Sequence, residues 1–156
     1  DDAIISYIKK EYNLMIGERT AEEIKITVGS AFPREEEQGM DIRGRDMVTG
    51  LPKTLTISST EIMESIHEPI NSIIDAIKLT LEKTPPELAS DIMDKGIMMT
   101  GGGSLLDGMD ELVRQETGMP VNISDNPLDC VVLGAGKVIN EIDTLRRVAV
   151  STKNVR

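Results

Sequence analysis

Aromatic residues, cysteine and histidine are scarce in this sequence. It has no tryptophan, one phenylalanine and two tyrosines among 156 residues, so it lacks the aromatic surfaces on which proteins stack single-stranded nucleic acid. Its only cysteine, Cys130, excludes an internal disulfide and is typical of a cytosolic protein. Its only histidine, His67, excludes a zinc site built from several Cys and His ligands. No apolar run approaches the roughly 20 residues that a membrane-spanning helix needs.

Positive charge is also in short supply. The sequence has 17 Lys and Arg residues against 27 Asp and Glu residues, for a formal net charge of -10. A field of this sign repels phosphate backbones and anionic lipid surfaces. We therefore expect no nucleic acid partner, and no direct membrane partner for this part of the protein. Basic side chains gather only in residues 146–156, which we interpret as a solvated tail.

The first 59 residues predict a small α+β unit. Apolar residues at helical spacing indicate one helix over residues 1–15. Thr20 and Glu23 have the spacing of a capping box, which predicts that a second helix starts at Thr20 and ends at Gly29. Two alternating segments, 40–44 and 53–57, predict a β-hairpin around a Gly-Leu-Pro turn.

One long amphipathic helix follows. Ser58 and Glu61 form a second capping box, Pro69 lies inside the helix, and Pro85 ends it. Six apolar residues repeat every three or four positions and predict its buried face: Ile62, Ile66, Ile70, Ile73, Ile77 and Leu81.

The remaining residues alternate between strand and helix patterns, which predicts a parallel sheet. After a short helix over 87–93, we expect a buried strand over 96–100 and a second strand over 121–123. Between them, Ser104 is predicted to cap a helix. The last helix, 128–142, has a Gly-Ala-Gly segment at 134–136, where we expect another element to pack closely.

The glycines between strand and helix form the clearest candidate site. Residues 101–103 are Gly-Gly-Gly, and consecutive glycines let a ligand approach the backbone. The start of a helix also offers free N–H groups and the positive end of its dipole. No Lys follows, which excludes a P-loop, and Leu106 occupies the third position of a dinucleotide fingerprint. The glycines alone do not distinguish a binding loop from a tight turn.

A second candidate patch lies on the second predicted helix. Glu22 and Lys25 are three residues apart and share a helix face. A carboxylate accepts hydrogen bonds from ribose hydroxyls, and a Lys stem can lie along a purine ring. A surface ion pair would have the same pattern, so this signal is also weak on its own. No nucleophile, base and acid are grouped as catalysis requires, and we name no catalytic residue.

Several motifs, in order, resemble the MreB family of bacterial actin relatives that determine rod shape. The resemblance covers residues 1–145. The matching motifs are GERTAEEIK at 17–25, IRGRD at 42–46, GLP at 50–52, TPPELASDI at 84–92, TGGGSLL at 100–106 and DNPLDCV at 125–131.

The resemblance implies an α/β architecture, the actin/Hsp70-like ATPase fold, in which two lobes clamp ATP and Mg²⁺. This chain would be the second lobe only. Residues 1–59 would form its small outer subdomain, 60–145 part of its ribonuclease-H-like inner subdomain, and 146–156 a tail. On motif match, two sets of residues would contact the nucleotide from opposite sides: Glu22, Glu23, Ile24 and Lys25 on adenine and ribose, and Gly101, Gly102, Gly103, Ser104 and Leu105 across from them.

The resemblance also implies what lies outside this segment. The first lobe, the metal-coordinating acids and the membrane-inserting segment of the family have no counterpart here. We therefore expect no metal ligands in this chain and no ATP hydrolysis by it alone. The whole protein would be a cytoplasmic filament ATPase that associates with the membrane. Its partners would be further copies of itself and membrane proteins of cell shape and wall synthesis.

Two other interpretations stay open. The chain could belong to another enzyme of the same fold class, such as a sugar or acid kinase or a chaperone ATPase. It could also be a non-catalytic interaction module.

Overall fold

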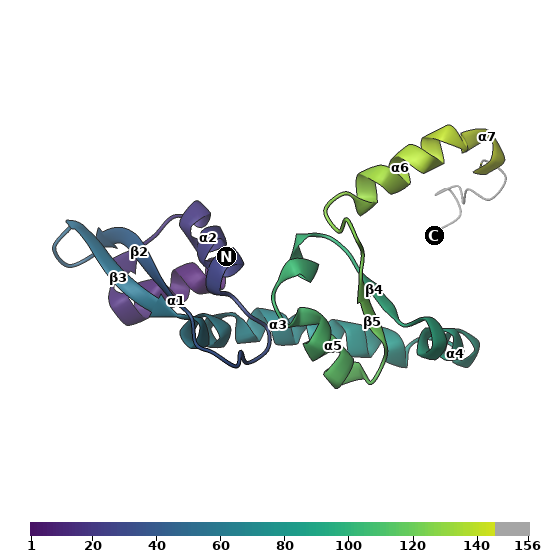
Figure 1. Cartoon of the computed structure of the whole chain (residues 1–156), viewed down its shortest axis with the longest axis horizontal. Coiled ribbons are helices and arrows are strands. Elements are labelled where there is room, and N and C mark those ends of the chain that lie inside the picture. Colours follow the sequence, from purple (N-terminus) through teal and green to yellow (C-terminus); the bar gives the residue numbers. More distant parts are fainter. Residues whose placement is uncertain (146–156) are drawn as a thin grey trace, which may run out of the picture.

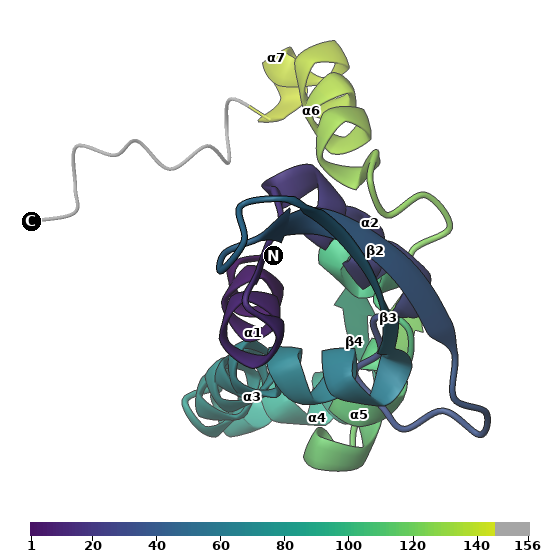
Figure 2. The ribbon, with the colours of Figure 1, turned by 90° about the vertical axis from the view of Figure 1, so that its left-hand side faces the viewer.

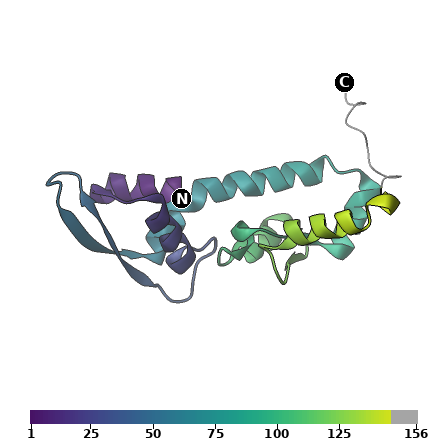
Figure 3. The same cartoon turned by 90° about the horizontal axis from the view of Figure 1, so that it is seen from above.

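One long helix, α3 (Ser59–Glu82), runs along the molecule and connects two groups of elements (Figure 1). The computed structural model describes residues 1–145, so the tail predicted over 146–156 lies outside the described residues. The first group packs around the N-terminal half of α3, and the second lies along its C-terminal half (Figure 3).

The first group contains two helices and a three-stranded antiparallel sheet of order β1-β2-β3. The predicted hairpin is confirmed, with Ile42 opposite Leu55 and Met40 opposite Ile57. The strand β1 was not predicted, because two residues are too short to show an alternating pattern. Figure 2 shows α1 and α3 on the inner side of the curved hairpin. The elements are α1 (Asp2–Tyr12), β1 (Leu14–Met15), α2 (Glu18–Val28), β2 (Gly39–Asp46) and β3 (Pro52–Ser58).

Of the two predicted capping boxes, one is confirmed and one is wrong. At the start of α3, the amide of Glu61 donates to the Ser58 hydroxyl over 3.3 Å, and the Ser58 amide donates to the Glu61 carboxylate over 2.8 Å. The helix α2 instead begins at Glu18 with Gly17 as its N-cap and no side-chain capping bond. Thr20 therefore lies inside α2.

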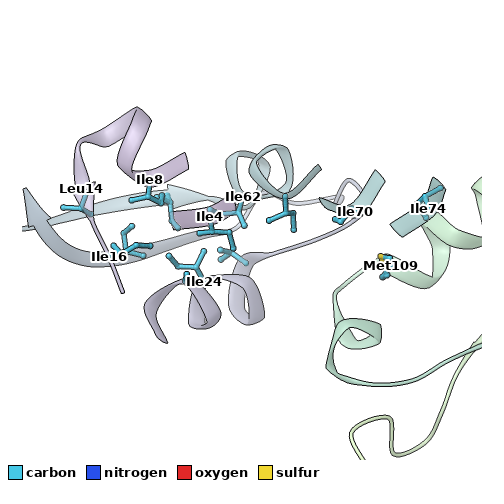
Figure 4. Close-up of a cluster of buried hydrophobic side chains, with 14 of the residues drawn as sticks. Ile4, Ile8, Leu14, Ile16, Ile24, Ile62, Ile70, Ile74 and Met109 are labelled. Carbon is cyan, nitrogen blue, oxygen red and sulfur yellow. The ribbon is translucent and has the colours of Figure 1, made fainter. Parts of the chain in front are cut away.

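The buried face of α3 departs from the predicted stripe at Ile73, whereas Ile77 further along is partly buried against the core. Ile62, Ile66 and Ile70 are buried, but Ile73 is 49 % exposed, and Ile74 is buried in its place. The reason is tertiary: Ile74 lies toward Met109, the first residue of α5 (Met109–Thr117), and both belong to the same core cluster (Figure 4).

The second group contains a two-stranded parallel sheet, as predicted. The predicted burial of its first strand is wrong for the described residues, because Met98 in the middle of that strand is 63 % exposed. The helix α5 packs against β5. Besides α5, the elements are α4 (Pro86–Lys95), β4 (Ile97–Met99), the 3-10 turn η1 (Gly102–Leu105), β5 (Val121–Ile123), α6 (Cys130–Asn140) and α7 (Ile142–Leu145).

The expectation that Ser104 caps a helix is wrong. The glycines lead into η1, a single turn of four residues, and α5 begins only at Met109. Gly108 separates the two helical segments because its φ of 71° is left-handed, a conformation that favours glycine. The helix expected to begin at Ser104 therefore does not direct its dipole at the glycine loop, residues 101–103.

The expected close packing at 134–136 is also wrong for the described chain. A side-chain Cβ placed on Gly134 or Gly136 would meet no atom within 4 Å. The helix α6 has no buried residue, although it is apolar on most sides. No helix among residues 1–145 is both long enough and apolar enough to cross a membrane.

A continuous hydrophobic core joins the two groups through α3. Its buried side chains run from Ile4 and Ile8 of α1, past Ile24 of α2, to Ile62 and then along α3 (Figure 4). The helix α3 begins at Ser59, where the boundary was predicted, and it contributes to both parts of the core.

Candidate nucleotide-binding site

The α2 patch presents two acidic side chains and one lysine. Glu22 and Glu23 are exposed, and Lys25 is partly exposed with its Nζ 2.8 Å from the Oδ1 of Asp1. Ile24 is fully buried in the core, so its side chain cannot touch a ligand, and its predicted role as a contact is corrected. Ile24 instead holds α2 against the core, which determines the direction in which its neighbours point.

Two hydrogen bonds at Gly101 fix the conformation of the glycine loop. Gly101 has a φ of 80°, and its amide donates to the carbonyl oxygen of Pro127 over 2.7 Å. The Ser104 hydroxyl donates to the carbonyl oxygen of Gly101 over 2.7 Å, and Ser104 is only 3 % exposed. Ser104 therefore supports the loop from inside instead of presenting its hydroxyl to solvent.

The upper surface of the loop is open. Gly102 and Gly103 are exposed, and a Cβ placed on Gly103 would meet no atom within 4 Å. They are the first residues of η1, so their N–H groups have no acceptor within that turn. Leu105 adds an exposed apolar side chain beside them. A ligand can thus approach the backbone at Gly103 directly, whereas a Cβ on Gly102 would lie 3.4 Å from the Cδ2 of Leu128.

The two patches extend from one junction. The amide of Ala31 donates to the carbonyl oxygen of Asp107 over 2.7 Å, and the Ser30 hydroxyl donates to the same oxygen over 3.2 Å. Ser30 lies just after α2, and Asp107 lies two residues after η1. Figures 1 and 3 show α2 and η1 on the same side of α3. With a rise of about 1.5 Å per residue, Lys25 lies roughly 4.5 Å from the end of α2 at Val28, just before this junction.

This junction was not predicted from the sequence. Ser30 and Asp107 are separated by 77 residues, and neither belongs to a motif with a recognised role. The only local signal was that α2 ends at Gly29. Among residues 1–145, no three Asp, Glu, His or Cys side chains are placed to hold a metal ion together.

Comparison with known families gives one match over nearly the whole chain. The model of the MreB/Mbl protein family matches residues 1–147. The cell shape-determining protein Mbl of Bacillus subtilis is 50 % identical over 145 residues, which cover 93 % of this chain and 44 % of that protein. The cell shape-determining protein MreB of Escherichia coli is 46 % identical over 143 residues, covering 92 % and 41 %. The chain therefore spans less than half the length of these relatives.

Solved structures give the same fold. MreB5 of Spiroplasma citri bound to ADP superposes with a TM-score of 0.87 at 39 % identity, covering 95 % of this chain and 45 % of that one. The same protein bound to AMPPNP gives 0.86. A MamK double helical filament gives 0.66 at 17 % identity, which indicates the fold alone. The predicted fold class, part of an actin-like α/β fold, is confirmed.

Proposed function

This chain belongs to the MreB/Mbl family, and from that membership we propose that it supplies the adenosine-binding side of an ATP site in a bacterial filament protein that determines cell shape. The observation that carries the proposal is the common junction of the two patches. Ser30, just after α2, bonds to Asp107, just after η1, and α2 and η1 lie on one side of α3, with Glu22, Lys25, Gly102 and Gly103 accessible.

Each accessible residue has a distinct role in this proposal. Glu22 accepts hydrogen bonds from the ribose hydroxyls, and the aliphatic stem of Lys25 packs on the purine. Gly102 and Gly103 leave room for the nucleotide to lie against the backbone. Ser104 and Ile24, both buried, keep the two walls rigid. To contact the ligand, Lys25 must give up part of its ion pair with Asp1.

The bound forms of a structural relative support an adenine nucleotide as the ligand. MreB5 of Spiroplasma citri has been solved with ADP and with AMPPNP, and it superposes on 95 % of this chain at 39 % identity. In the whole protein, ATP would be accompanied by Mg²⁺. Other segments would supply the metal ligands and the attacking water, so this chain alone would hold nucleotide without hydrolysing it.

Self-association into filaments is the second part of the proposal. Mbl and MreB are named as cell shape-determining proteins, and MamK, of the same fold, has been solved as a double helical filament. The whole protein would polymerise with ATP in the cytoplasm. It would associate with the membrane and with wall-synthesis proteins through parts outside these residues.

A site-resolved titration tests the nucleotide proposal. The ¹⁵N-labelled chain is titrated with AMP while its backbone amide shifts are followed by NMR, a method that detects weak binding. We expect saturable shifts in residues 22–25 and 101–105. Shifts confined to other residues, or none at millimolar AMP, would contradict the proposal and favour a non-catalytic interaction module.

A lysine pair supplies the matched control for that titration. Lys25→Met should weaken AMP binding because it removes the charged end of the proposed purine contact. Lys9→Met, on the exposed side of α1, should bind AMP like the unmodified chain. Equal weakening by both variants would point to nonspecific charge attraction.

A further inference from the structure

The loop between α2 and β2 is tied to the turn after η1 by an arginine. The Nε of Arg34 lies 2.7 Å from the Oδ2 of Asp107, and this ion pair joins residues 73 positions apart. The side chain of Arg34 is only 17 % exposed, whereas that of Asp107 is 58 % exposed. Arg34 is therefore the more buried partner of this ion pair, and Asp107 belongs to the other group of elements.

Arg34 makes two further contacts that anchor it. Its Nη2 donates to the carbonyl oxygen of Gly29 at the end of α2 over 3.1 Å, and its Nη1 donates to the side chain of Gln38. Gln38 is itself tied to the start of α3, because its amide donates to the Ser59 hydroxyl over 3.0 Å and its carbonyl oxygen accepts from the Ser59 amide over 2.7 Å. One guanidinium thus connects the end of α2 with the first turn of α3 and with Asp107.

The turn at Asp107 allows little adjustment. A Cβ on Gly108 would lie 2.6 Å from the Cβ of Phe32, so the two backbones are already in close contact there. The loop between α2 and β2 lines a surface hollow of about 500 Å³ together with Asp107 and Gly108. The backbone hydrogen bond from Ala31 to Asp107 connects this loop to the turn after η1, and the ion pair adds a second connection.

We propose that Arg34 and Asp107 are positioning residues that fix the distance between α2 and the glycine loop, and thereby control how tightly the chain holds an adenine nucleotide. The inference rests on the proposed adenosine site. Neither residue touches the nucleotide in this proposal. Their ion pair lies near the end of α2 that is joined to the turn after η1. A small rotation of α2 about this end moves Glu22 and Lys25, which lie further along the helix, by a larger distance than it moves the ion pair.

A charge exchange tests the proposal, with the Kd for AMP measured by the same NMR titration. Arg34→Asp and Asp107→Arg should each raise the Kd roughly two- to fivefold, the range expected from a partly exposed ion pair. The double variant, with the charges exchanged, should recover most of the affinity. A purely local effect of either substitution on folding would not be reversed by the second.

The control removes a comparable ion pair elsewhere. Lys78 pairs with Glu116 over 2.5 Å between α3 and α5, so Lys78→Ala breaks another ion pair between distant residues and leaves both α2 and the glycine loop unchanged. It should leave the Kd unchanged. Hydrogen exchange of the Ala31 amide supplies a readout that needs no nucleotide, and Arg34→Asp should accelerate it because the backbone bond to Asp107 opens more often.

The outcomes separate the two proposals. If the unmodified chain binds AMP and the single variants bind it equally well, the positioning role is wrong and the site stands. Weakening that the charge exchange does not reverse would also overturn the positioning role. If the unmodified chain binds no AMP, the proposed site fails and this inference fails with it.

Discussion

The hydroxyl of Tyr12, at the end of α1, donates a hydrogen bond to the Oε1 of Glu61, the residue that completes the capping box of α3. Tyr7 lies 3.5 Å from the same oxygen and packs edge-on against the Tyr12 ring. One carboxylate therefore caps the longest helix and joins it to α1. The bond raises the pKa of Tyr12 to about 12, with burial and the charge of Glu61 adding to the effect.

Alkaline pH should destabilise the chain through Tyr12. The pKa of Tyr12 is higher in the folded chain than its ordinary value of 10, so its contribution to stability is complete below pH 10 and is lost as pH rises towards about 12. The free energy of unfolding in urea, measured across this interval, should fall less steeply for Tyr12→Phe than for the unmodified chain. Parallel curves for the two proteins would contradict the assignment.

Acid should remove the contribution of Glu61. Burial acts to raise the pKa of this carboxyl, but hydrogen bonds from Tyr12, Ser58 and Tyr7 outweigh burial and lower its pKa below the ordinary 4.5. Its contribution is therefore present above pH 4.5 and is lost as pH falls through the lower folded value. The difference in unfolding free energy between the unmodified chain and Glu61→Gln should shrink over that range. A difference that does not change with pH would mean that the charge of Glu61 is unimportant.

Removing the helix cap should cost about 1 kcal/mol. Ser58→Ala deletes the hydroxyl that accepts from the Glu61 amide, and loss of such a cap typically costs this much. Ser72→Ala is the matched control, because its hydroxyl only donates to the Glu68 carbonyl oxygen on the exposed face of α3. Urea unfolding gives both values. Equal losses would show that the cap contributes nothing beyond an ordinary surface serine.

A side chain at Gly44 should disrupt the pairing of β1 with β2. A Cβ there would lie 2.5 Å from the carbonyl oxygen of Met15 and 2.8 Å from the Cγ of Leu14. Since one of these atoms is backbone, the strand must move, and we expect Gly44→Ala to destabilise the chain by about 1–3 kcal/mol. Gly134→Ala, with nothing within 4 Å, should be neutral or slightly stabilising. The melting temperatures of both variants, compared with that of the unmodified chain, test this prediction.

The exposed apolar surface of α6 should make the chain self-associate. Ile139 is 67 % exposed, and most of its neighbours on that helix are apolar as well. Ile139→Lys should lower the average mass measured by sedimentation velocity at high concentration. Ile26→Lys makes the same change on α2, where Ile26 is 73 % exposed on a helix with a mostly charged outer face, and should have little effect. If Ile26→Lys lowers the average mass equally, the added charge and not the surface of α6 controls the association.

Local signals in the sequence were sufficient for most of the elements. The capping pair Ser58 and Glu61, the spacing of Ile62, Ile66 and Ile70, and the alternation around the hairpin each depend on neighbours within a few residues, and all three were predicted correctly. The family motifs then identified the fold, because they occur in order over most of the chain.

Predictions failed where a contact between distant residues decided the outcome. The helix expected after Ser104 is interrupted because the turn at Asp107 and Gly108 bonds to Ala31 and packs against Phe32. Ile74 replaces Ile73 in the core because α5 packs against that side of α3. Ile24 was expected to touch a ligand, yet the packing of α2 turns its side chain inward.

By itself, the sequence determined most of the helices and strands and the family to which the chain belongs, since both are recorded in the order and spacing of side chains. Only the tertiary structure decided that the segment after α2 and the turn after the glycine loop meet, through Ser30, Arg34 and Asp107. No local pattern encodes that meeting, because its hydrogen bonds join residues more than seventy positions apart, and they form only when both groups of elements are packed on α3.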